Sequence, residues 1–149
     1  MLVERPKTKG TLNMERTDRI RLLTRFEVAT LVAGAGLVLL GQLLPFAYLP
    51  TGGVRDDSTL APILLGVMAL SWAIAGSRRW RWAAAAGAAG TIALGGYGAL
   101  AGLRAIPTWA AVNYGADGTP GPAIFVATAG LALASIAVFV RAFASSRPA

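Results

Sequence analysis

The chain of 149 residues contains no cysteine and no histidine. These absences exclude disulfide bonds, thiol chemistry, zinc sites of the usual kind and histidine-ligated haem. They also remove the commonest proton shuttle at neutral pH. The sequence has no GxSxG motif, no P-loop and no dinucleotide-binding fingerprint that follows a strand. We therefore expect a protein that is not an enzyme and that has no metal or cofactor.

Charged residues are scarce, at 14% of the chain, where about 25% is usual for a soluble domain. Hydrophobic residues reach 55% and gather in four stretches, in which Glu27 at the edge of the first is the single charged residue. A helix of about 20 residues crosses the hydrocarbon core of a bilayer. The pattern predicts an all-α polytopic membrane protein: four transmembrane helices in an antiparallel bundle over 26–143, with spans at 26–44, 60–76, 82–103 and 121–140.

The distribution of lysine and arginine predicts the orientation. Twelve of the 14 cations precede the first stretch, separate the second from the third, or follow the fourth, and only Arg55 and Arg104 lie in the other two connections. The positive-inside rule then puts both termini in the cytoplasm and the protein in the cytoplasmic (inner) membrane. The net charge of +7 fits anionic lipid headgroups on that side, so no nucleic acid partner is needed to explain it.

Residues 1–25 form a basic tail, and residues 144–149 form a short cytoplasmic C-terminal tail. From Met14 onwards, apolar residues alternate with arginines, including Arg16, Arg19 and Arg25. This pattern predicts a short amphipathic helix that lies at the cytoplasmic interface and leads into the first span. Its arginines have two interpretations: they contact lipid phosphates, or they dock on a protein partner.

Small residues dominate the third span, where 15 of 22 residues are alanine or glycine. Small residues let the backbones of neighbouring membrane helices approach closely, so we expect the third span to be the central helix, with its packing face used inside the bundle or for docking. The predicted packing residues are Ala83, Gly87, Thr91, Gly95, Ala99, Gly98 and Gly102. A second small-residue seam, at 3–4–3 spacing, runs through the fourth span: Ala127, Gly130, Ala134 and Ala137.

The connection between the second and third spans interleaves cations with indoles: Arg78, Arg79, Trp80, Arg81 and Trp82. Single-strand nucleic-acid binders combine these residue types. At a membrane face, however, an interfacial anchor explains them more simply, with indoles at headgroup depth and arginines on lipid phosphates.

Few polar side chains lie inside the spans. Glu27 is a candidate proton or cation site, but its place near the cytoplasmic end favours a structural role. Gln42 and Tyr97 need partners if they face the interior. The outer connections offer one further candidate ligand site, if they fold together, although ordinary loop polarity also explains its residues: Asp56, Asp57, Asp117, Arg104, Tyr48, Trp109 and Tyr114.

The layout combines a first helix ending at Leu43-Leu44-Pro45-Phe46, an outer turn with Gly52-Gly53 and Asp56-Asp57, and a short Arg/Trp inner turn. It resembles small four-helix integral membrane proteins of high-GC actinobacteria, a group without an assigned activity. The resemblance implies a fold and a membrane location, and it supplies no functional residues.

The leading hypothesis is a non-enzymatic accessory or structural subunit of a larger membrane protein complex, whose other subunits would be its partners. The alternative is a small oligomeric transporter or channel, which requires a polar cavity formed by Glu27, Gln42, Thr91 or Tyr97. A third hypothesis is an envelope sensor or assembly factor that uses the outer connections.

Overall fold

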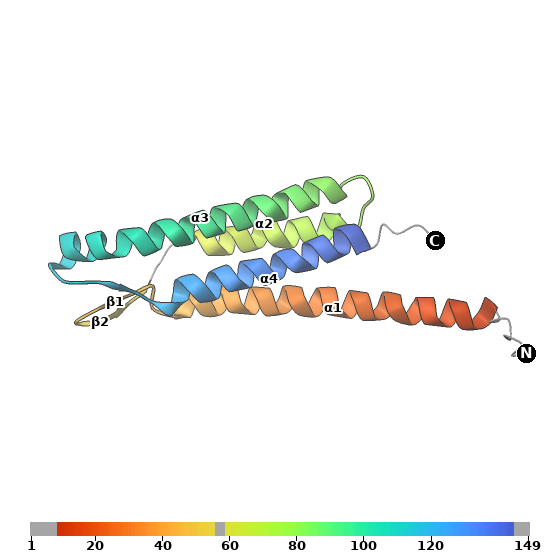
Figure 1. The fold of residues 1–149 in the computed structure, drawn as a ribbon, viewed down its shortest axis with the longest axis horizontal. Coiled ribbons are helices and arrows are strands. Elements are labelled where there is room, and N and C mark those ends of the chain that lie inside the picture. Colours follow the sequence, from red (N-terminus) through yellow and green to blue (C-terminus); the bar gives the residue numbers. More distant parts are fainter. Residues whose placement is uncertain (1–8, 56–58, 145–149) are drawn as a thin grey trace, which may run out of the picture.

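A computed structural model of the chain describes residues 9–55 and 59–144, and of the side chains in residues 9–20 it describes only that of Asp18. Residues 145–149 of the predicted C-terminal tail (144–149), residues 1–8 of the N-terminal tail, and Asp56 and Asp57 lie outside the described residues, whereas Ala144 is the last residue of α4. Four helices form an elongated bundle (Figure 1), as the sequence predicts: α1 (Lys9–Leu43), α2 (Leu60–Ala75), α3 (Arg81–Tyr114) and α4 (Pro122–Ala144).

Three of the helices are long and apolar enough to cross a membrane: Arg21–Leu43 within α1, the whole of α3, and α4. α2 has 16 residues and is therefore about 24 Å long, shorter than a hydrocarbon core of about 30 Å. The composition and length of three helices thus fit a membrane protein. The predicted fourth crossing does not follow from the length of α2.

The N-terminal part of α1, predicted as a short amphipathic helix that leads into the first span, is helical and continuous with that span, and its place at the membrane interface stays a prediction. Residues 9–43 form a single helix, and Figure 1 shows its first half continuing along the same axis past the other helices. Sharp kinks in helices occur mostly at proline or glycine, and the sequence has neither between Thr11 and Ala33. The helix therefore runs on without a break.

α3 is longer than the predicted third span, because Pro107 lies inside the helix instead of in a connection. Proline removes one backbone hydrogen bond from a helix interior. Burial offsets this loss, since Ile106 and Ala110, on either side of Pro107, are fully buried at the position where α3 contacts the chain around Gly118. The helix ends at Gly115, whose positive φ of 61° and N–H bond to the Ala111 carbonyl form a left-handed C-terminal cap.

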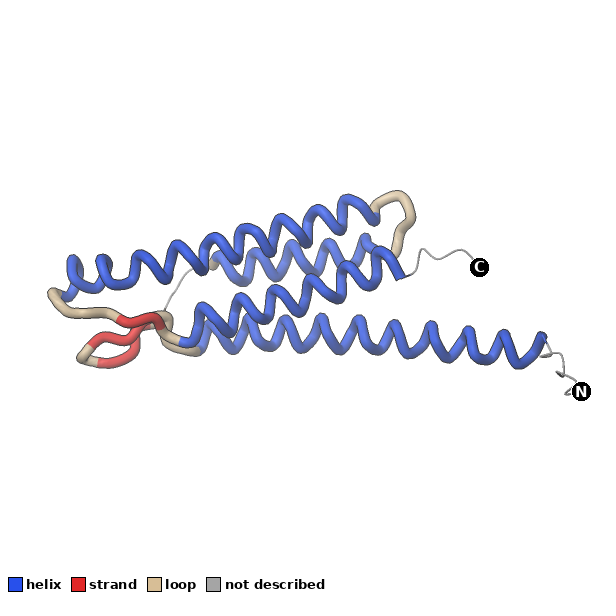
Figure 2. The backbone as a smooth tube through the Cα atoms, viewed as in Figure 1, coloured by secondary structure: helices blue, strands red, loops and turns tan. Residues whose placement is uncertain are grey.

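A small antiparallel sheet, which the sequence analysis missed, joins the two outer connections. Its strands are β1 (Ala47–Leu49), β2 (Gly52–Val54) and β3 (Thr119–Pro120), in the order β2-β1-β3. Figure 2 shows them at one end of the bundle, here called the sheet end. The opposite end, which carries the connection between α2 and α3, is called the arginine end. Pairing of β1 with β3 brings the start of α4 against the end of α1.

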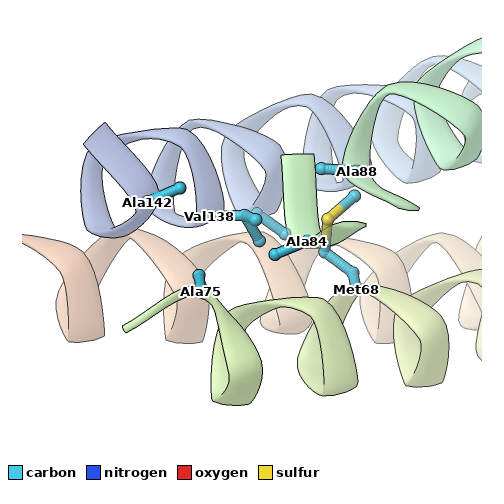
Figure 3. Close-up of a cluster of buried hydrophobic side chains, with 7 residues drawn as sticks. Met68, Ala75, Ala84, Ala88, Val138 and Ala142 are labelled. Carbon is cyan, nitrogen blue, oxygen red and sulfur yellow. The ribbon is translucent and has the colours of Figure 1, made fainter. Parts of the chain in front are cut away.

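α4 occupies the centre of the bundle, and not α3 as predicted. α4 packs along α1 and also contacts α2 and α3. The main core lies towards the arginine end, where seven buried side chains of α2, α3 and α4 meet (Figure 3): Met68, Ala75, Ala84, Ala88, Ala134, Val138 and Ala142.

Candidate functional site

The closest helix contact in the bundle is the seam between α1 and α4. A Cβ atom added to Gly34 would lie 2.6 Å from the Gly130 carbonyl oxygen and 2.7 Å from the Ala134 nitrogen. About two turns further along α1, a Cβ on Gly41 would lie 3.0 Å from the Ala127 Cβ. The small-residue seam of the fourth span therefore faces α1. The sequence analysis missed its partners, although Gly34 and Gly41 follow Glu27 at intervals of seven residues.

The same antiparallel register sets Glu27 of α1 opposite Arg141 of α4. The Arg141 Nη1 and Glu27 Oε2 atoms are 3.6 Å apart, and Glu27 is buried, at 7% exposure. The Arg141 guanidinium also lies 4.1 Å from the ring centroid of Trp72 on α2. A Cβ on Gly76 would be 3.3 Å from the Arg141 Nε atom, so glycine leaves room for the guanidinium. Three helices thus meet around one ion pair, which supports the structural interpretation of Glu27.

The predicted interfacial anchors lie at the same end. Arg78, Arg79 and Trp80 are exposed, Arg81 is half-buried, and Trp82 is exposed. Two of the arginines lie over neighbouring indole rings, Arg79 at 5.7 Å from the Trp80 centroid and Arg81 at 5.8 Å from that of Trp82. Their shared position at one end of the bundle is the one that an interfacial anchor requires, and anchoring itself stays a prediction.

The predicted packing residues of α3 fall into two groups, apart from Ala83, which is exposed. Towards the arginine end, a Cβ on Gly87 would lie 2.5 Å from the Ser71 Oγ atom, and Thr91 is buried. The neighbouring core positions are Ala84 and Ala88, not Ala83. A strict interval of four residues turns by about 40° at each step around a helix of 3.6 residues per turn. A long contact face therefore has to alternate steps of three and four.

The other group, Gly95, Gly98, Ala99 and Gly102, lines a pocket of about 140 Å³ near the sheet end. We call this cavity the sheet-end pocket. α1 contributes Gln42, α2 contributes Leu60 and Leu64, and α4 contributes Ile124 and Leu131. Four of the seven predicted packing residues of α3 therefore border this pocket, and a Cβ on Gly95 would also lie only 2.8 Å from the Leu131 Cδ1 atom of α4.

The structure does not bring together the polar residues that a transport pathway would need. Glu27 pairs with Arg141 at the arginine end, while Gln42 lines the sheet-end pocket. Thr91 donates its hydroxyl hydrogen to the Gly87 carbonyl of its own helix, at 2.8 Å. Tyr97 is 74% exposed on the outer surface of the bundle. Of these four residues, the sheet-end pocket is lined by Gln42 alone.

At the sheet end, the two outer connections fold together, as the candidate ligand site there requires. Trp109 lies between two aromatic rings, with centroid distances of 5.8 Å to Phe46 and 5.2 Å to Tyr114. Tyr48, Arg104 and Asp117 are exposed. Among the described residues, no group of three or more His, Cys, Asp and Glu side chains could hold a metal ion. Of the residues of the predicted site, Trp109 and Tyr114 are therefore in ring contact, and the ligand site itself stays a prediction.

No family model, curated protein or solved structure matches the chain. Three features of this molecule bear on its function: the helix that extends beyond the bundle, the ion pair at the arginine end, and the sheet-end pocket.

Proposed function

We propose that the chain is a non-enzymatic accessory subunit of a larger membrane protein complex, with four crossings of the cytoplasmic membrane and both termini in the cytoplasm. Three helices have the length and composition of spans. α2 is shorter, yet it carries the chain from the sheet end, where α1 stops, to the arginine end, where α3 begins. Local thinning of the bilayer accommodates a short helix of this kind.

The observation that carries the proposal is the extension of α1 beyond the bundle (Figure 1). The ion pair between Glu27 and Arg141 sets a register that puts Ala144, the last residue of α4, opposite Thr24. Residues 9–23, here called the projecting arm, continue past that point by about 22 Å at 1.5 Å per residue. No other helix of the bundle extends as far in this direction (Figure 1).

A projecting helix of this length favours a partner. Isolated helices shorter than about 12–15 residues are marginal in water, so a helix outside the bundle gains from contact with another surface. The projecting arm carries four cations, Lys9, Arg16, Arg19 and Arg21, against two carboxylates, Glu15 and Asp18. An acidic surface on a neighbouring subunit matches this charge.

The test is native mass spectrometry of the tagged full-length chain, extracted from its source membrane in a mild detergent. The wild-type chain should carry a partner subunit in fixed stoichiometry. The double variant Arg19→Gln/Arg21→Gln should lose that partner, because it removes two cations from the projecting arm.

The matched control is Arg78→Gln/Arg79→Gln, which removes two cations at the same end of the bundle but outside the arm. It should retain the partner. A wild-type chain that runs alone, without any stoichiometric partner, contradicts the proposal. Equal loss in both double variants would instead assign the arginines to lipid headgroups.

A further inference from the structure

We propose that the sheet-end pocket binds the acyl chain of a membrane phospholipid, with the ester end of the chain at Gln42. This inference is independent of the accessory-subunit proposal, because it depends only on the cavity and on the membrane around it.

The lining of the pocket excludes water. Of the 15 lining residues, only Gln42 and Thr128 are polar. Thr128 already donates its hydroxyl hydrogen to the Ile124 carbonyl at 2.7 Å. A buried water needs two to four polar partners, and apolar cavities stay dry. The pocket therefore suits hydrocarbon.

The pocket is large enough for part of a lipid acyl chain. Its volume of about 140 Å³ is close to that of an engineered cavity of about 150 Å³ that binds benzene, so it accepts a stretch of roughly six carbons. Leu64 and Leu131, both buried, line the pocket and also form a buried cluster with Val38.

At Gly98 and Gly102 the pocket borders a missing side chain, whereas Gly41 and Gly95 in the same lining make close contacts with Ala127 and Leu131. A Cβ on Gly98 would be 3.7 Å from the Leu60 Cδ2 atom, and one on Gly102 would be 3.6 Å from the Ile124 Cδ1 atom. Both are ordinary van der Waals distances, so packing does not demand glycine at either position. An unfilled cavity costs its lining the dispersion contacts that a guest would restore.

The position of the pocket selects a lipid as the guest. Its walls include α1, α3 and α4, the three helices that can cross a membrane. The cavity is partly open, and the medium around such helices is acyl chains. Gln42 lies one residue before the end of α1 and shares the pocket with Phe46. The described residues offer its amide no hydrogen bond, so its N–H groups are available to an ester carbonyl.

The test uses the full-length protein in nanodiscs that contain phosphatidylglycerol with a photoreactive diazirine on one acyl chain. After irradiation, peptide mass spectrometry locates the labelled residues. We expect label on the pocket-lining parts of residues 95–102 and 124–131. Gly98→Leu, which fills the pocket, should lower that labelling about tenfold, which corresponds to about 1.4 kcal/mol of binding.

The matched control is Gly90→Leu on the same helix, since a Cβ at Gly90 meets nothing within 4 Å. It should leave the labelling of the pocket unchanged. If Gly98→Leu fails to fold, Gly98→Ala/Gly102→Ala gives the same comparison, because both new methyl groups fit at ordinary distances. Labelling that is no stronger in the pocket than on exposed Leu94 and Leu100, or that filling leaves unchanged, overturns the proposal.

A second experiment tests whether the bound acyl chain belongs to a phospholipid or to a free fatty acid. The phosphatidylglycerol probe is replaced by a free fatty acid that carries the same diazirine. Labelling of the pocket by the phospholipid supports the proposal, and labelling by the free acid alone overturns it in favour of a soluble amphiphile. Gln42→Leu should weaken labelling by the phospholipid while Gly90→Leu does not, and equal labelling in both variants would remove the role given to the amide.

Discussion

The two halves of the bundle use the same small residues and reach opposite results. Towards the arginine end, Met68, Ala84, Ala88, Ala134 and Val138 have no exposed surface. Towards the sheet end, the same three helices and α1 surround a pocket of about 140 Å³. Alanine and glycine therefore lead to dense packing in one half and to a cavity in the other.

The difference lies in the residues opposite each glycine. Gly34 faces Gly130, and each backbone lies where the other's side chain would be. Gly98 and Gly102 instead face the side chains of Leu60 and Ile124, which hold the helices apart. A small residue thus permits close approach, and the size of its partner decides whether the approach takes place.

The largest expected effect on stability comes from adding a side chain at the close contact between α1 and α4. Gly34→Val should lower the free energy of unfolding by about 3 kcal/mol or more, because overpacking against a backbone leaves little room for adjustment. Thermal unfolding in a mild detergent, followed by circular dichroism, measures it. Gly36→Val is the control, since a Cβ at Gly36 meets nothing within 4 Å. Equal stability of the two variants would contradict the close seam.

A cavity made in the dense half should be the next largest effect. Met68→Ala removes a side chain with no exposed surface, and the lost contacts should cost about 2 kcal/mol. This is the low end of the range for soluble cores, because lipid offers unfolded helices an apolar medium. The same unfolding measurement applies, with exposed Val67→Ala as control. If both variants unfold alike, the half around Met68 is not densely packed.

Loss of the ion pair at the arginine end should have a smaller effect. Glu27→Gln leaves Arg141 over Trp72 without its carboxylate, and we expect about 1–2 kcal/mol, between the values for exposed and buried pairs. A double-mutant cycle with Arg141→Gln measures the coupling between the two side chains. Asp117→Asn, a change at an exposed carboxylate, should be neutral. A coupling of zero would mean that the pair contributes nothing to the seam.

The smallest effect on stability is expected at the sheet-end pocket. Gly102→Ala should raise the free energy of unfolding by up to about 1 kcal/mol, since alanine favours a helix more than glycine and its methyl group fits beside Ile124. Gly96→Ala, with nothing within 4 Å of its added Cβ, separates helix propensity from cavity filling. Destabilisation by Gly102→Ala relative to this control would mean that α3 packs tightly there.

Much of the fold could be predicted from the sequence, because apolar length and the turn residues are local signals. The predicted spans at 60–76 and 121–140 differ from α2 and α4 by only a few residues. The extension of α3 past Pro107 could not be predicted, since it depends on how the connection after the helix folds back on Ile106 and Ala110 through Gly118. The strands were missed for the same reason: β1 and β3 are each short, and they pair across two helices and their connections.

The candidate sites were harder to predict, because they depend on which residues of different helices lie opposite one another. The seam of the fourth span was visible as a 3–4–3 pattern, and its partners Gly34 and Gly41 could have been found from their seven-residue spacing after Glu27. The pocket could not be predicted, because a run of glycines does not show whether leucine or glycine lies opposite it on the neighbouring helix. Gln42 was identified as a polar residue in need of a partner, and the structure gives its position in the pocket.

The pairing of β1 with β3 ties completion of the fold to the order of synthesis. β1 emerges early, whereas β3 follows α3, and the bonds from the Gly121 and Ala123 N–H groups to the Phe46 and Pro45 carbonyls arrive with α4. Until then, one edge of β1 has no partner, and an open strand edge is a template for pairing with other chains. Closure of this edge therefore waits for the segment that leads into α4, so that the sheet end of the fold is complete only after α2 and α3 have been made.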